Sequence, residues 1–254
     1  MDKISVIIVT LNEERNIGRA LDSVKRIADE VIVVDSFSID RTKEICESHK
    51  VKFVQTDWKG YSETKNYANS LAENNYIFSL DADEAVDKYL EKIILAKKHE
   101  GLKGLYTLNR KTNYCGKWIN HSGWYPDKKI RIFPKNKTKW VGEFVHEELQ
   151  FSEGMNEVDL PGHLEHYSYY NYIEHRTRAD KYSLLTAKKM AAAGKKAGVL
   201  KPYLSAIGRF ISMYIFKLGF LDGKMGFKIA QISAQSNTVK YKELRKLNRE
   251  NANH

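Results

Sequence analysis

Cysteine is scarce in this chain, and long apolar runs are missing. Cys46 and Cys115 are the two cysteines among 254 residues, too few for a disulfide framework or a cysteine zinc site, so we expect a reducing compartment. No stretch of about 18 uncharged apolar residues occurs, which argues against a simple membrane-spanning helix. Residues 1–4 lead straight into a β-type stretch, without the basic segment and cleavage site of a signal peptide.

Glycine-rich phosphate-binding loops are also missing. Neither GxGxxG nor GxxxxGK[ST] occurs, so the sequence predicts neither a dinucleotide-binding fold nor a P-loop. Residues 11–14 read Leu-Asn-Glu-Glu, where a nucleotidyltransferase usually carries a glycine-rich loop. No helix-turn-helix or RNP motif is found either, so we expect no nucleic-acid partner. Apolar residues make up 42% of the chain, too many for a disordered protein.

Acidic residues are few in the last hundred positions. Residues 155–254 hold 17 basic and 8 acidic side chains, a net charge of +9, whereas residues 1–154 hold 25 and 24, a net charge of +1. A basic region of this kind is typical of proteins that meet nucleic acid, an anionic membrane surface or a phosphorylated substrate. Charge alone does not choose among these three.

The first hundred residues alternate between apolar runs and helical patterns. Strands are predicted at 5–10, 30–34, 51–54 and 76–80, with helices at 12–27, 42–49 and 61–73. This alternation predicts an α/β domain with a mostly parallel sheet. Farther on we expect strands at 104–108 and 129–133, a helix at 172–194, an apolar helical stretch at 203–221 and a polar tail at 240–254.

Polar side chains follow three of the predicted strands. Ligands of open α/β sheets bind at the carboxyl ends of the strands, so the common position of these residues predicts a site. They are Thr10, Asn12 and Glu13 after the first strand, Asp35 after the second, and Asp81 and Asp83 after the fourth. Asp81 and Asp83 could hold Mg²⁺ or Mn²⁺, which would bridge a diphosphate; a solvated acidic turn fits the spacing equally well.

Three further residues have two interpretations each. Asp35 could accept a hydrogen bond from a base or a ribose, or belong to a capping cluster in which Asp40 is the better cap. Lys65 could reach a phosphate, although a solvated helix face is the commoner role. Glu147 could take the proton from an attacking hydroxyl group; it and its neighbours Glu143 and Glu148 could also be surface charges.

Three tryptophans also have two interpretations. Trp118, Trp124 and Trp140 could stack on sugars or pack in the core.

Six segments give the chain a resemblance to a known family. In order, they are SVIIVTLNEE, VIVVDSFSIDRT, KNYA, FSLDADE, KIRIFPK and WVGEFVHEEL. Together they resemble family 2 glycosyltransferases with the GT-A fold, and within them bacterial lipopolysaccharide core β-glucosyltransferases. The resemblance implies a GT-A catalytic domain at 1–165, with a donor-binding half at 1–103 and an acceptor-side half at 104–165. A basic, helical C-terminal region follows at 166–254.

The resemblance also implies roles for individual residues. Asp83 matches the metal-binding position of the DxD motif, with Mg²⁺ or Mn²⁺ as the cofactor, and Glu147 falls where the family carries its catalytic base. The remaining matches concern the donor: Thr10, Asn12 and Glu13 in the nucleotide-contacting loop, Asp35 at the nucleobase, Lys65 near the diphosphate and Asp81 at the ribose or sugar.

The implied reaction is an inverting, metal-dependent transfer of a hexose. The expected donor is UDP-glucose, and the expected acceptor is a lipid-linked lipopolysaccharide core or another envelope glycan. A metal-dependent nucleotidyltransferase and a non-enzymatic nucleic-acid-binding module are the alternatives.

The stretch at 203–221 predicts where the protein works. On a helix, one stripe would carry Leu204, Ile207, Ile211, Ile215 and Leu218. Other large side chains lie off that stripe, beside Arg209 and Lys217: Phe210, Met213, Phe216 and Phe220. One side can pack on the catalytic domain while the other faces something else, and an interfacial helix with basic residues suits peripheral binding to the cytoplasmic face of the inner membrane. A helix buried between two partners, or a dimer contact, is the alternative.

Overall fold

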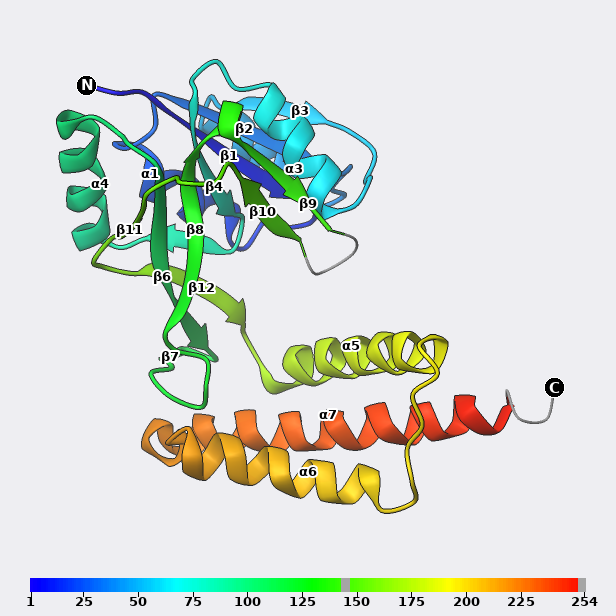
Figure 1. Cartoon of the computed structure of the whole chain (residues 1–254). Coiled ribbons are helices and arrows are strands. Elements are labelled where there is room, and N and C mark those ends of the chain that lie inside the picture. The colour runs from blue at the N-terminus through cyan, green and yellow to red at the C-terminus, as the bar shows by residue number, and fades with distance from the viewer. Residues whose placement is uncertain (143–146, 251–254) are drawn as a thin grey trace. The chain divides into compact units, whose positions relative to one another are not determined.

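The structure, a computed structural model, describes residues 1–142 and 147–250. Contacts divide the chain into two units (Figure 1). Residues 1–110 and 127–167 form the first unit, and residues 111–126 together with the chain from 168 onward form the second. The predicted boundary at 165 places residues 111–126 in the catalytic domain instead. They group with the second unit because Tyr114 and Ile119 are buried in one cluster with Met213 and Ile229.

The first unit is built on a mixed sheet. Its order is β3-β2-β1-β4-β8-β6-β12-β5. The first four strands pair in parallel, as predicted: β1 (Ile4–Thr10), β2 (Glu30–Asp35), β3 (Lys52–Gln55) and β4 (Tyr76–Asp81). The strands that follow pair mainly antiparallel: β5 (Glu84–Val86), β6 (Leu105–Tyr114), β8 (Asp127–Pro134) and β12 (Leu164–Tyr169).

Short strands and one turn complete the β structure. The strand β11 (Glu157–Asp159) pairs with β6, and β9 (Thr138–Val141) forms a hairpin with β10 (Glu148–Phe151). In the second unit, β7 (Lys117–Trp118) pairs with the end of β6. A 3₁₀ turn, η1 (Lys135–Lys137), lies between β8 and β9.

Helices cover both faces of the parallel strands. One core cluster joins alternate residues of β1 to α1 (Ile17–Val24), α2 (Thr42–Ser48) and α4 (Lys88–Glu100). The other joins Ile7 and Ile77 to α3 (Tyr61–Ser70). Burial on both faces explains the continuous β-branched runs of these strands. It also leaves the carboxyl ends of the strands as the open edge of the sheet.

The second unit is mainly helical. The helices α5 (Tyr172–Ala192) and α6 (Lys201–Ile211) both pack on the long α7 (Gly223–Glu250) (Figure 1). Between α6 and α7 lie a π-helical turn, η2 (Ser212–Phe216), and a 3₁₀ turn, η3 (Gly219–Asp222). The predicted polar tail at 240–254 is wrong as far as residue 250, because α7 continues to Glu250 and buries Leu244.

The predicted lack of a simple spanning helix agrees with the structure. Within residues 1–142 and 147–250, no single helix is both long and apolar enough to cross a membrane. Lys201–Phe216 and Gly219–Glu250 meet those limits only when taken as a pair, and they are bent by 72°.

Candidate active site

The ends of three parallel strands bring the predicted residues to one edge of the sheet. The register of β1 and β2 pairs Thr10 with Asp35, and that of β1 and β4 pairs Val9 with Asp81. The acidic ends of β2 and β4 therefore flank the end of β1. This is the convergence that the strand pattern predicts.

The loop after β1 is held by the loop after β2. Asn12 adopts a left-handed backbone conformation with φ of 55°; its amide donates to Ser38 Oγ at 2.7 Å. The amide of Glu13 donates to Thr42 Oγ1 at 2.8 Å. Thr10 is buried, and its Oγ1 has no hydrogen-bond partner among the residues that the structure describes. These contacts fix the backbone of the edge while leaving one buried hydroxyl group available.

Asp35 is buried and held by its own loop. Its carboxylate accepts hydrogen bonds from the Ser38 amide at 2.8 Å, from the Ser38 hydroxyl group and from Gln55 Nε2 at 3.1 Å. Asp40 accepts from the amide of Thr42, the first residue of α2, at 3.0 Å, although the N-cap position itself is occupied by Arg41. Asp35 is thus a rigid acceptor rather than a cap, and its contact with a nucleobase stays a prediction.

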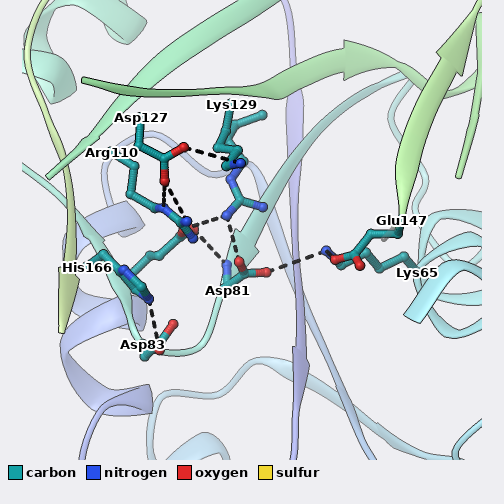
Figure 2. Close-up of polar contacts among 10 residues, drawn as sticks. Lys65, Asp81, Asp83, Arg110, Asp127, Lys129, Glu147 and His166 are labelled. Atoms are coloured by element: carbon teal, nitrogen blue, oxygen red, sulfur yellow. Dashed lines mark hydrogen bonds and ion pairs between the residues drawn. The ribbon is translucent and has the colours of Figure 1, made fainter. Parts of the chain in front are cut away.

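Lys65 is shared by two carboxylates (Figure 2). Its Nζ lies 3.6 Å from Asp81 Oδ1 and 3.2 Å from Glu147 Oε1, and 4.6 Å from the ring centroid of Trp140. Only 6% of Lys65 is exposed, so its placement on a solvated helix face is wrong. A buried ammonium group must be paired, and here Asp81 and Glu147 pair with it.

Arg131, on β8, neutralises the other side of Asp81. One guanidinium nitrogen lies 2.6 Å from Asp81 Oδ2 and also contacts Glu84, a fully buried carboxylate. Burial by itself would raise the pKa of Asp81, but Arg131 and Lys65 more than offset it and hold that pKa well below its ordinary value. Burial raises the pKa of Glu84, against the opposing effect of Arg131.

The charges continue into the sheet in alternating sign. Arg110 lies 3.5 Å from Glu84 and 2.6 Å from Asp127, and Lys129 lies 3.2 Å from Asp127 (Figure 2). The sequence analysis missed Arg110, Arg131 and Glu84. The available signal was a charged residue inside the apolar strand at 129–133, which requires a buried counter-charge.

Asp83 meets a histidine from a distant strand. His166 Nε2, on β12, lies 3.3 Å from Asp83 Oδ2, and the amide of Tyr167 donates to the backbone oxygen of Asp83 at 2.8 Å. The antiparallel pairing of β5 and β12 creates this contact by setting His166 opposite Glu84. No sequence spacing could reveal it, because 83 residues separate the two side chains.

The chemistry of this pair suits a divalent cation. A carboxylate oxygen and an imidazole nitrogen are ligands that Mn²⁺ accepts. Within the described residues, no cluster of three or more His, Cys, Asp or Glu side chains is arranged to hold a metal ion. The remaining ligands would therefore come from a bound molecule such as a diphosphate.

Glu147 and its neighbours differ in their surroundings. Glu147 is partly buried, and its Oε1 accepts from Lys65. Glu148 is exposed at the start of β10. Glu143 and His146 lie outside the described residues. Trp140 is buried against Phe133, with ring centroids 5.9 Å apart, which fits the packing interpretation.

Comparison with known proteins adds to this geometry. The model of the family "Glycosyl transferase family 2" matches residues 5–163. The chain is 32% identical to an uncharacterized glycosyltransferase of Rickettsia felis, over 96% of this chain and 90% of that one. It is 26% identical to the lipopolysaccharide core biosynthesis glycosyltransferase LpsC of Rhizobium meliloti, over 91% and 87%.

Among solved structures, S. aureus TarS has a similar fold. The TM-score is 0.50 at 17% identity, and the match covers 94% of this chain and 55% of that one. At this identity the likeness supports the arrangement of strands and helices and says nothing about substrates.

Proposed function

The chain belongs to glycosyl transferase family 2 and has the predicted GT-A fold, and from this premise we propose that it transfers glucose from UDP-glucose to a hydroxyl group of a lipopolysaccharide core. The transfer inverts the anomeric carbon and depends on a divalent cation. The name of the relative LpsC supports this class of acceptor, and another lipid-linked envelope glycan has the same chemistry.

One observation carries the proposal: Lys65 lies between Asp81 and Glu147. A cation next to the DxD carboxylate is placed to balance the charge of a diphosphate, and the second carboxylate lies 3.2 Å away on its other side. A donor site and a proton acceptor are thus adjacent. Transfer to a hydroxyl group requires this adjacency, because the attacking oxygen must lie close to the anomeric carbon.

The donor lies along the open edge of the sheet in this proposal. Asp35 accepts from the base, and the residues at the end of β1 bind the nucleoside: Thr10, Asn12 and Glu13. Asp81 binds the ribose or sugar. The contacts that fix this edge in the absence of a ligand support such a role, because a preorganised site loses less entropy when it binds.

Asp83 and His166 are the residues that would hold the cation. A bound Mg²⁺ or Mn²⁺ ion would neutralise the diphosphate as negative charge builds up on it. His166 is an addition to the set that the sequence predicts, and it supports the choice of Asp83 as the metal-binding carboxylate.

Glu147 takes the proton from the acceptor hydroxyl group. The acceptor oxygen then forms a bond to the anomeric carbon from the face opposite the diphosphate, while the bond to the β-phosphate oxygen breaks. UDP leaves with the bonding electron pair, and Lys65 compensates part of its charge.

The experiment compares two neighbouring glutamates. We expect Glu147→Gln to abolish UDP release from UDP-glucose in the presence of purified lipopolysaccharide core acceptor, while retaining the thermal shift caused by UDP-glucose and Mn²⁺. Glu148→Gln, an exposed control, should keep its activity. Full activity of Glu147→Gln would refute the assignment of the base.

We also propose that the protein works at the cytoplasmic face of the inner membrane. The net charge of +9 over residues 155–254 supports this location, because an anionic membrane attracts a basic surface. A lipid-linked acceptor would be presented at the same surface.

A further inference from the structure

Large exposed apolar side chains gather on one segment of the second unit. Six of them recur at helical spacing over residues 200–218, from the residue before α6 to the second residue after η2: Leu200, Leu204, Ile207, Ile211, Ile215 and Leu218, each between 37% and 66% exposed. We call these six residues the apolar face. Phe216, which falls off this stripe at helical spacing, is 79% exposed as well. A surface of this kind on a soluble domain marks an interaction site.

The opposite side of the same helix already has its own core. Met213 is buried in one cluster with Ile229 and Ala230 of α7. The ring of Phe210 lies 5.6 Å from that of Phe227 and 5.3 Å from that of Tyr214. The segment therefore does not need the apolar face to fold, and this resolves which of its two sides packs internally.

The charge around the apolar face has one sign. Residues 195–228 contain seven basic side chains and one acidic one, Asp222. Asp222 is 2% exposed, and its carboxylate accepts from the amides of Asn120 and His121 at 3.0 and 3.1 Å, so it adds no negative charge to the surface. Six of the basic residues are exposed: Lys195, Lys196, Lys201, Arg209, Lys217 and Lys224.

We propose that the apolar face and its basic rim bind an anionic lipid surface, with the segment 200–218 lying in the plane of the interface. An apolar stripe beside basic residues is the pattern of helices that bind in the headgroup region. Exposed Arg209, in the last turn of α6 and near the middle of the segment 200–218, suits a position on the membrane rather than across it. This inference names the surface by which the protein would bind the proposed membrane. It rests on the proposed function only for the reason why the protein would bind a membrane.

A second copy of the chain fits this surface less well. A symmetric contact between two apolar faces would bring two basic rims together, and like charges across an interface oppose association. Anionic lipid supplies the missing negative charge. It also accepts the side chains of the apolar face without requiring a matching shape.

Vesicle flotation of the full chain tests the proposal. The probes are vesicles of phosphatidylcholine alone and of phosphatidylcholine with about 30% phosphatidylglycerol. We expect binding to the anionic vesicles, weaker binding at about 0.5 M salt, and little binding to the neutral ones. Equal binding to both compositions, or binding to neither, would overturn the proposal.

Paired variants locate the surface. Leu204→Asn/Ile207→Asn should weaken binding to anionic vesicles at least about tenfold, because both side chains are exposed and leave the lipid contact. The matched control is Ile173→Asn on α5, which removes a 77% exposed apolar side chain from the same unit and should bind like wild type. If the double variant floats like wild type, or if wild type is a dimer that the double variant dissolves, the surface serves another role.

Two further measurements on the same samples distinguish a failure of the membrane proposal from a failure of the proposed function. The melting temperature of the double variant should match that of wild type, which shows that it is folded. Its thermal shift with UDP-glucose and Mn²⁺ should also be unchanged. If the double variant no longer floats with anionic vesicles but keeps the thermal shift with UDP-glucose and Mn²⁺, the result supports the membrane surface. If no sample shows that thermal shift, wild type included, the result counts against the proposed function and not against the membrane surface.

Discussion

Arg131 offers the sharpest test of how the site is held. Its guanidinium group contacts both Asp81 and Glu84, and the side chain of Glu84 is 0% exposed. Arg131→Met keeps the unbranched stem of the side chain and removes the guanidinium group with its charge. The substitution leaves a buried carboxylate with Arg110, 3.5 Å away, as its remaining cation.

The cost follows from this burial. Removing one partner of a buried ion pair costs about 3–5 kcal/mol, and Arg110 keeps the value near the lower end, about 3 kcal/mol. For units of this size each kcal/mol lowers the melting temperature by about 2–4 °C, so Arg131→Met should melt about 6–12 °C below wild type. Adding Glu84→Gln removes the unpaired charge and should recover about half of that loss.

The assay is thermal denaturation followed by circular dichroism at pH 7. Lys128→Met is the matched control on the same strand, because Lys128 pairs with Asp159 at the surface, where an ion pair contributes less than about 1 kcal/mol. The reasoning is refuted if Arg131→Met melts like this control, or if the double variant is no more stable than Arg131→Met.

Three further predictions concern single side chains. If the proposed transfer is right, Lys65→Met should lower the turnover of UDP-glucose at least about tenfold, with partial recovery in Lys65→Arg, because the charge proposed to lie next to the diphosphate is lost. Unchanged turnover would contradict this proposed role. Burial lowers the pKa of His175 to about 4, so below pH 6.5 the unfolded chain binds a proton that the folded state resists. The free energy of unfolding should therefore fall as the pH drops from 6.5 toward 4, by up to about 1.4 kcal/mol per pH unit. Urea titrations at pH 7 and 5 measure this loss, which His175→Gln should reduce. Burial raises the pKa of Cys46 to about 12, so at pH 8 a thiol reagent should label Cys115 before Cys46, and labelling of Cys46 should require unfolding.

The parallel half of the fold was predictable because its strands carry a strong signal. Strands buried on both faces become continuous β-branched runs, and β1, β2, β3 and β4 lie within a residue of their predicted positions. The helix predicted at 12–27 is shorter, because Asn12 takes a left-handed conformation and α1 begins at Ile17. Local turns of this kind do not alter hydrophobic spacing.

The helix α7 was missed for a different reason. Its second half is mainly polar, and Leu244 is its one buried residue beyond Ile232. Packing against α5 and α6 stabilises it, and that tertiary contact leaves little periodicity in the sequence. The break after η2 was missed too, because helical spacing continues through it to Leu218.

The candidate site divides in the same way. Asp81 and Asp83 follow a strongly patterned strand, and the resemblance to the family implied Lys65 and Glu147. Arg131 and His166 lie on β8 and β12, which pair antiparallel with β4 and β5. The register of these pairs decides which carboxylates the two side chains meet, and the sequence does not reveal that register. Membership of family 2 argues against both the nucleotidyltransferase and the nucleic-acid-binding alternatives.

The segments of the two units alternate along the sequence. The chain passes from one to the other after residues 110, 126 and 167. A fragment ending at 167 would carry Tyr114 and Ile119 without Met213 and Ile229, the residues that bury them. We therefore expect the stretch that matches the family, residues 5–163, to expose these two side chains when the helices of the second unit are absent. A graft of the second unit onto another catalytic domain would need one internal insertion, residues 111–126, together with a second piece joined after residue 167, so we expect the two units to be inherited together.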